Sequence, residues 1–271
     1  MASAITSRDA VVSFLRRHAW SAVLAGWLIS RFVLSLPRMI HVGSVVVAAG
    51  FLAALYAAVR LPSLLFTEAD DRIAVHVLNG IIADSVFYWI VRPGMGAPLG
   101  VTGPWDPVVF AGSGAGLVVM LAATSLAGLC GARIRAATRA PTRWHALLAG
   151  AGVVGAIVVF RVSNVMLRDL PNEDRSLFIA GCEVHHAVTG ALLVALLGML
   201  LATRCLPNAL PVALACGVAS GFVLDQTTYL MLRNVSDEAY FGAASLAGAC
   251  AAAIVYVIAL VYLWRSRRGT G

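Results

Sequence analysis

The sequence contains a series of apolar runs of roughly 18 to 25 residues, and no other feature limits the fold as strongly. A helix rises 1.5 Å per residue, so a run of this length crosses the roughly 30 Å hydrocarbon core of a bilayer. A transmembrane β-barrel would instead need strands of about ten residues in which apolar and polar side chains alternate. Hydrophobic residues make up 60% of the chain and charged residues 12%, against about 25% charged in soluble domains. We therefore expect an all-α, polytopic membrane protein with the lipid bilayer as its surroundings.

The apolar runs predict eight transmembrane helices, although His76, Asn79 and Asp84 interrupt the third run. Eight spans with cytoplasmic termini place thirteen of the twenty basic residues on the inner side and five in outer loops, as the positive-inside rule requires. Seven spans would put the arginine cluster at 133–143 outside. We therefore predict a multi-pass protein of the cell inner membrane. The expected spans are 19–36, 42–61, 73–91, 108–129, 145–166, 177–201, 209–231 and 240–264.

All twenty basic residues are arginines, and the formal net charge is +7. The absence of lysine excludes Schiff-base chemistry and lysine general bases. The arginines cluster beside the apolar runs, where they set membrane topology. The positive charge therefore does not indicate nucleic acid as a partner.

The pattern GxxxDxxxYxxxR occurs twice, from Gly80 to Arg92 in the third span and from Gly221 to Arg233 in the seventh. Arg31 in the first span corresponds to Arg161 in the fifth. We therefore expect two tandem four-span repeats, and an even number of spans in each makes them parallel. The first repeat covers 1–132 with an outer insertion at 93–107, an arginine-rich cytoplasmic linker covers 133–144, and the second repeat covers 145–271.

Small residues also recur, as AGSGAG at 111–116 and AASLAG at 243–248. Small side chains at four-residue spacing let helices approach closely. We interpret this recurrence as packing without chemistry. Close packing is also the alternative explanation for the repeated glycines of the longer pattern.

Under the eight-span topology, nearly all the ionisable residues within the spans fall in the outer half, and only His76 lies further in. A charged side chain within a membrane is costly unless it is paired or hydrated. The distribution predicts a polar cavity that opens to the extracytoplasmic face.

The densest group of polar residues in this region is Glu183-Val184-His185-His186, near the predicted start of the sixth span. On a helix Glu183 and His186 would share one face in the ExxH spacing of helical metal sites. Asp225 is the expected third ligand, and His41, with Asp84, could complete a second shell or a second metal position. A mixed nitrogen and oxygen donor set suits zinc or iron.

These residues suggest a metal-dependent hydrolase or transferase that acts on a lipid-linked or other anionic substrate. The metal would lower the pKa of a bound water, and His185 would act as acid and base. Asp84 and Tyr229 are further catalytic candidates. The anionic group would be bound by arginines at positions 31, 161 and 233.

Three alternatives stay open. Asp84 and Asp225 could be permanent ion-pair partners of Arg31 and Arg161 that hold the two halves together. Tandem parallel repeats are also typical of proton- or ion-coupled transporters, although His76 is then the only ionisable residue of the spans towards the inner side. The chain could also be a non-catalytic assembly factor or sensor.

Overall fold

The computed structural model describes residues 18–34, 42–61, 64, 70–94, 107–134, 142–167, 178–179, 182–183, 186–231 and 240–268. The described chain is almost entirely helical. Its elements are α2 (Ala19–Leu28), the π-helix η1 (Ile29–Leu34), α3 (Val42–Arg60), α5 (Asp70–Gly94), α6 (Pro107–Ile134), α7 (Arg143–Leu167), β1 (Phe178–Ile179), β2 (Cys182–Glu183), α9 (His186–Ala202), α10 (Leu210–Met231) and α12 (Ala243–Arg268).

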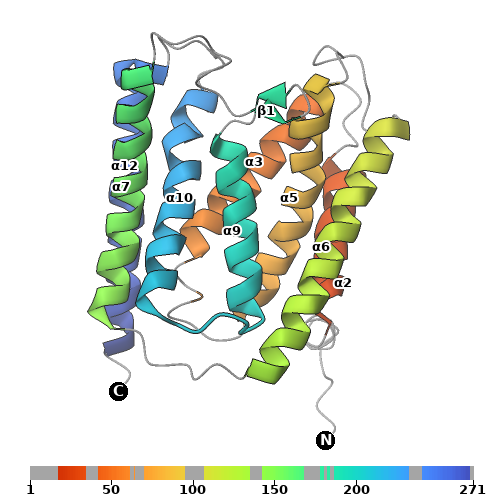
Figure 1. Ribbon diagram of the computed structural model, residues 1–271, viewed down its shortest axis with the longest axis horizontal. Helices are drawn as coiled ribbons and strands as arrows, with labels where there is room; N and C mark the ends of the chain where they lie inside the picture. Colours follow the sequence, from red (N-terminus) through yellow and green to blue (C-terminus); the bar gives the residue numbers. More distant parts are fainter. Residues whose placement is uncertain are drawn as a thin grey trace, which may run out of the picture.

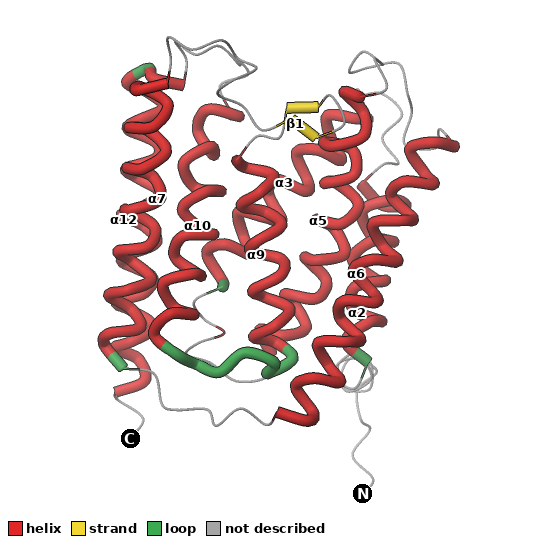
Figure 2. The backbone as a smooth tube through the Cα atoms, in the orientation of Figure 1, coloured by secondary structure: helices red, strands yellow, loops and turns green. Residues whose placement is uncertain are grey.

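The helices form one bundle, in which we name α2 to α6 the N-terminal half and α7 to α12 the C-terminal half (Figure 1). The start of α2 and the end of α12 lie at the same end of the bundle. The loop that joins α9 to α10 lies at that end too, whereas β1 and β2 lie at the opposite end (Figure 2).

The two halves have the same internal neighbours. In the N-terminal half, α5 packs against α2, α3 and α6, and α2 packs against α6. In the C-terminal half, α10 packs against α7, α9 and α12, and α7 packs against α12. The halves meet where α5 and α3 contact α9 and where α10 contacts α3, and α6 also contacts α9. We name this region the interface between the halves.

Seven of the eight predicted spans correspond closely to a described helix or, for the first span, to α2 followed by η1. The sixth prediction is wrong at its start, because α9 begins at His186 and not at residue 177. Phe178 pairs instead with Glu183, and Ile179 with Cys182, in an antiparallel two-stranded sheet. The polar residues Glu183, His185 and His186 lie at this boundary, from the end of β2 to the start of α9.

Three helical segments are long and apolar enough to cross a membrane, among the residues that the structure describes: Phe110–Gly131, Arg143–Met166 and Ala243–Arg265. Val188–Ala202 and Leu210–Gln226 are shorter apolar helices. The central helix α5 is less apolar, and it can carry polar residues because α2, α3, α6 and α9 surround it. Several apolar helices in one bundle are consistent with a lipid bilayer environment.

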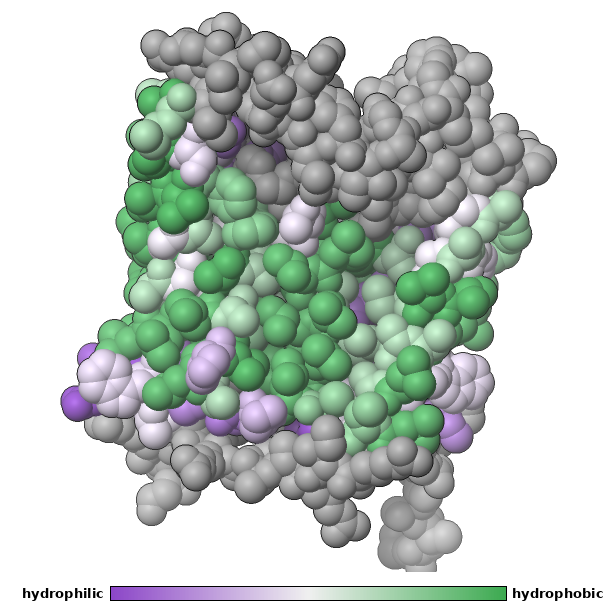
Figure 3. Space-filling view, in the orientation of Figure 1, coloured by the Kyte–Doolittle hydropathy of each residue, from purple (hydrophilic) through white to green (hydrophobic). Residues whose placement is uncertain are grey.

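The apolar helices at the edge of the bundle expose large hydrophobic side chains. Val119 on α6, Met166 on α7 and Ile258 on α12 are each more than half exposed. The face seen in Figure 3 is apolar across its middle and more polar towards its lower rim. Exposed apolar faces of this size are expected to contact lipid.

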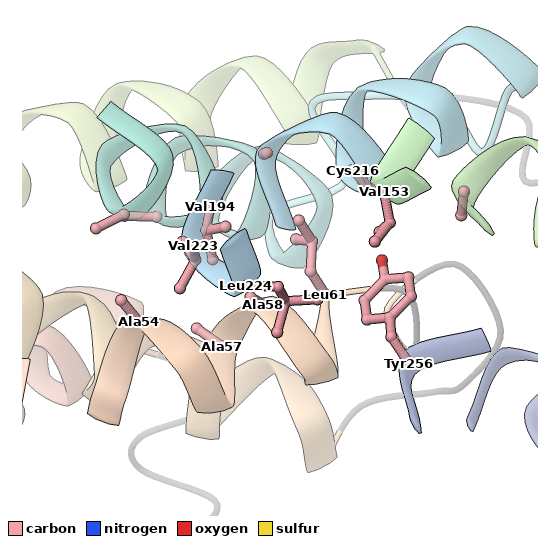
Figure 4. Packing of buried hydrophobic residues seen from close by; sticks show 14 of the residues in the cluster. Ala54, Ala57, Ala58, Leu61, Val153, Val194, Cys216, Val223, Leu224 and Tyr256 are labelled. Atoms are coloured by element: carbon pink, nitrogen blue, oxygen red, sulfur yellow. The ribbon is translucent and has the colours of Figure 1, made fainter. Parts of the chain in front are cut away.

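Small side chains dominate the buried core. Alanines of α3, including Ala54, Ala57 and Ala58, face Val194 of α9 and Val223 of α10 (Figure 4). Small residues bring helix backbones close together, which is how helices associate where water supplies no hydrophobic driving force.

Candidate functional site

Arg31 and Asp84 form a fully buried ion pair in the N-terminal half. Arg31 Nε lies 2.6 Å from Asp84 Oδ1, and neither side chain is exposed. The Ser30 hydroxyl donates to Asp84 Oδ2 at 2.6 Å, and the Ser113 hydroxyl of α6 donates to Oδ1. Both carboxylate oxygens are therefore engaged. We name these four residues, together with Trp27, the first cluster.

The local backbone and an aromatic pair shape the first cluster. Ser30 and Arg31 lie in η1, the wider π turn that follows α2. Such turns occur frequently at functional sites. The Trp27 indole donates to Ser113 Oγ at 2.8 Å, and Arg31 Nε also donates to that oxygen, at 3.2 Å. Phe110 packs edge-on against Trp27. Helices α2, α5 and α6 are thus joined at one point.

Arg161 and Asp225 form the corresponding ion pair in the C-terminal half, with Arg161 Nε 2.6 Å from Asp225 Oδ1. The Tyr240 hydroxyl donates to Asp225 Oδ2 at 2.5 Å. Arg161 Nη1 donates to the Tyr240 carbonyl, and Nη2 donates to Ser245 Oγ at 3.0 Å. The guanidinium also lies 4.0 Å from the centre of the Tyr240 ring, a cation–π geometry. We name these four residues the second cluster.

The two clusters use the same three residue types from corresponding helices. The arginine comes from η1 or α7, the aspartate from α5 or α10, and the serine from α6 or α12. Gly80 and Gly221 each lie one helical turn before the aspartate. At both glycines, an added Cβ would come too close to a backbone carbonyl, that of Val23 or that of Val153. Each of those valines lies eight residues before the arginine.

The ion pairs that the sequence offered as an alternative are thus present, but the position given to them there is wrong. The sequence suggested pairs that hold the two halves together. Each pair instead lies within one half, because Arg31 packs against the third helix of its own half and Arg161 does the same in the other.

The hydrogen bonds bear on the roles that we predicted for these residues. Asp225 and Asp84 have both carboxylate oxygens engaged, so a metal ion at Asp225 or a proton transfer at Asp84 would have to displace an existing partner. An anionic substrate at Arg31 or Arg161 would have to compete with an aspartate. Among the described residues, no three His, Cys, Asp or Glu side chains lie close enough to hold a metal ion.

The helical ExxH arrangement is wrong for a structural reason. Glu183 lies in strand β2, and His186 is the first residue of α9, so the two do not share a helical face. The side chains of Glu183, His186 and Tyr229 lie outside the described residues, as do His41, His185 and Arg233 altogether. The zinc or iron site that these residues suggested therefore stays a prediction.

Sequence reasoning missed five members of the clusters: Trp27, Ser30, Ser113, Tyr240 and Ser245. We had interpreted the recurring small residues that contain Ser113 and Ser245 as packing only, but both hydroxyls contact the ion pairs. The sequence could have indicated a role for Ser113 and Ser245, because the two serines recur at matching places in the two halves. Ser30 and Tyr240 have no such recurrence.

The interface between the halves carries its own polar contacts. Asn79 of α5 donates through Nδ2 to the Ala195 carbonyl of α9 at 3.1 Å. Ser220 of α10 donates to the Ala58 carbonyl of α3 at 2.9 Å. The two donors occupy matching positions, since each lies five residues before the aspartate of its helix.

Comparison of the chain with protein-family models, with curated proteins and with solved structures finds no match.

Proposed function

We propose that the chain is a membrane carrier built from two tandem, parallel four-helix units that cross the membrane eight times in total. In this proposal the units correspond to the N-terminal and C-terminal halves. A small polar solute passes along the interface between the halves as one unit moves against the other. This is the transporter alternative from the sequence.

The matching registers support the tandem repeat. Within each half the first and third helices approach through a glycine, one turn before the aspartate that pairs with the arginine of the first helix. The neighbour relations of α5 within the bundle are those of α10. Parallel repeats are related by an axis along the membrane normal, and substrate sites in such transporters lie at the repeat interface.

The observation that carries the proposal is the position of the ion pairs. Breaking a buried pair costs about 3–5 kcal/mol, so each cluster holds the first, third and fourth helices of its own half together. The interface between the halves contains small side chains, with Ala54 and Ala58 on one side and Ala195 on the other. Among the described residues, two hydrogen bonds to backbone carbonyls cross it. Such an interface can shift at much lower cost than either half can deform.

The hydrolase hypothesis has less support. It depended on a helical ExxH motif, which is replaced by strand β2 and the start of α9, and on an available Asp225 carboxylate. Both Asp225 oxygens have partners. The carrier proposal needs neither feature.

The proposal is tested by double electron–electron resonance, which measures the distance between two spin-labelled cysteines, with the protein in lipid nanodiscs. We would replace the five native cysteines by serine and label Leu129 of α6 together with Leu147 of α7, two exposed residues from different halves. The matched control pair is Leu52 and Leu129, which are exposed residues of the same half.

A carrier should give two populated distances for the pair across the halves, recorded at pH 5.5 and pH 8. The control pair should give one distance at both pH values. A single, unchanging distance across the halves would reject the carrier proposal.

A further inference from the structure

Two buried polar side chains of α5, His76 and Asn79, lie in the part of the helix before the first cluster, and Asn79 reaches the interface between the halves. His76 and Asn79 are three residues apart and therefore lie on one face of the helix. Asn79 is fully buried, and His76 is 4% exposed. Asn79 contacts Ala195, and Val75 lies beside Gly198, so Asn79 and Val75 face α9 of the other half, and His76 lies one turn before Asn79.

Each of the two side chains has a buried atom whose hydrogen-bonding capacity is not used. His76 Nδ1 and Asn79 Oδ1 have no hydrogen-bond partner among the residues that the structure describes. Such atoms are rare inside proteins, and each calls for a ligand, a water or a functional reason. An ionisable residue inside a membrane is a functional candidate by default.

We propose that His76 binds the coupling proton of the carrier and that Asn79 stabilises the protonated ring. This inference rests on the carrier function proposed above. Protonation makes both ring nitrogens donors, so Nδ1–H gains an acceptor in Asn79 Oδ1, directly or through one water. The proton enters from one side of the membrane, is held on the ring while the halves shift, and leaves on the other side.

The charges around His76 favour reversible binding. A protonated His76 would lie one helical turn from the Arg72 guanidinium, so the site does not hold the proton permanently. The Asp84 carboxylate, two turns further along α5, is neutralised by Arg31. The other described titratable groups on the elements that pack against α5 are His18, Tyr56, Arg60 and Cys130.

The test measures how pH changes the populations of the two distances across the halves, and how many protons the purified full-length protein takes up between pH 8 and pH 3.5. In the wild type, we expect acidification to shift the population towards one distance. His76→Gln should remove this shift and take up one proton fewer. A His76→Gln protein that keeps both the shift and the proton would overturn the proposal, and a bridging water would then explain the unsatisfied atoms.

Two further variants keep the test decisive if His76→Gln does not fold. Asn79→Leu removes the acceptor but keeps the ring, so the midpoint of the shift should move to lower pH by about one to two units. Its matched control is Ser220→Ala, which also loses one hydrogen bond across the interface and should leave the midpoint unchanged. Equal midpoints in both variants would reject the role of Asn79.

A second control uses His145 of α7, the other buried histidine among the described residues. Its Nδ1 accepts a hydrogen bond from the Thr142 backbone amide, within the C-terminal half. His145→Gln should keep the pH-dependent shift. The two proposals fail separately: a single distance across the halves rejects the carrier, whereas two distances whose ratio ignores pH reject only the proton site.

Discussion

The first and second clusters contain the same arginine, aspartate and serine, yet they differ in how completely the protein covers the arginine. Arg31 exposes none of its side chain, whereas Arg161 exposes 11%. Asp84 has Ser30 on its second oxygen, and Asp225 has Tyr240 there. The ion pair itself is the same in both clusters, and the surrounding residues determine how far the arginine is exposed to solvent.

The difference begins with two residues beside each arginine. Trp27 and Ser30 precede Arg31 by four residues and one residue, and Ile157 and Phe160 hold those places before Arg161. Ile157 and Phe160 cannot donate hydrogen bonds, so Tyr240 supplies the missing donor from before α12. The comparison shows that the ion pair fixes the contact between two helices, while its supporting bonds can come from different elements.

The largest expected effect separates the two aspartates. Asp84→Ala leaves the Arg31 charge buried and should lower the free energy of unfolding by about 3–5 kcal/mol. Asp225→Ala should cost less, because Arg161 is partly exposed and keeps its bonds to the Tyr240 carbonyl and Ser245. Denaturation of the micellar protein followed by circular dichroism measures both.

The double variant Arg31→Met with Asp84→Leu is the control for this prediction, because it removes both charges and should recover most of the loss. Equal losses for the two aspartate variants would show that the exposure of Arg161 has no energetic meaning.

Substitution of the cluster serines should also lower the free energy of unfolding more in the first cluster than in the second, and by less than substitution of the aspartates. Ser113 donates to a carboxylate and accepts from Trp27 and Arg31, so Ser113→Ala should cost about 1.5–3 kcal/mol. Ser245 contacts one guanidinium nitrogen, and Ser245→Ala should cost about 1 kcal/mol. The same denaturation experiment applies. A larger loss at Ser245 would reverse our ranking of the clusters.

The two matching glycines allow a third comparison. An alanine at Gly80 meets the Val23 carbonyl and the Trp27 amide, which cannot move without shifting a helix, and should cost about 1–3 kcal/mol. Gly221→Ala meets the Ala156 side chain 2.7 Å away as well as backbone, and should cost less.

Gly114→Ala is the matched control, because no other part of the described chain lies within 4 Å of an added Cβ there. The alanine should stabilise the helix or leave it unchanged. Thermal unfolding in detergent ranks the three variants, and a destabilised Gly114→Ala would mean that glycine loss acts through the helix itself.

The smallest effect concerns the indole of Trp27. Trp27→Phe keeps the ring against Phe110 but removes the bond to Ser113, and should cost about 0.5–1.5 kcal/mol. Trp144→Phe, at an exposed position on α7, should leave the stability unchanged. Thermal unfolding of both variants measures the difference. Equal values would show that the indole bond contributes nothing to the first cluster.

Much of the candidate site could be predicted from residues that are rare in apolar helices. Arg31, Arg161, Asp84 and Asp225 were visible as charged residues in apolar runs, and their correspondence indicated the two pairs. The supporting residues could not be ranked in the same way, because a serine or a tyrosine costs little in such a helix. The ExxH prediction failed because it assumed a helix over residues 183–186.

The sequence by itself determined the helices and the residues that had to find partners. An apolar run must satisfy its backbone hydrogen bonds internally, so it forms a helix whatever surrounds it. A charge within such a run must be paired, whichever helix supplies the partner. The tertiary structure alone decided that each pair closes within one half and that Asn79 and Ser220 reach across the interface. Those contacts depend on the rotation of each helix about its axis, which only packing against its neighbours sets.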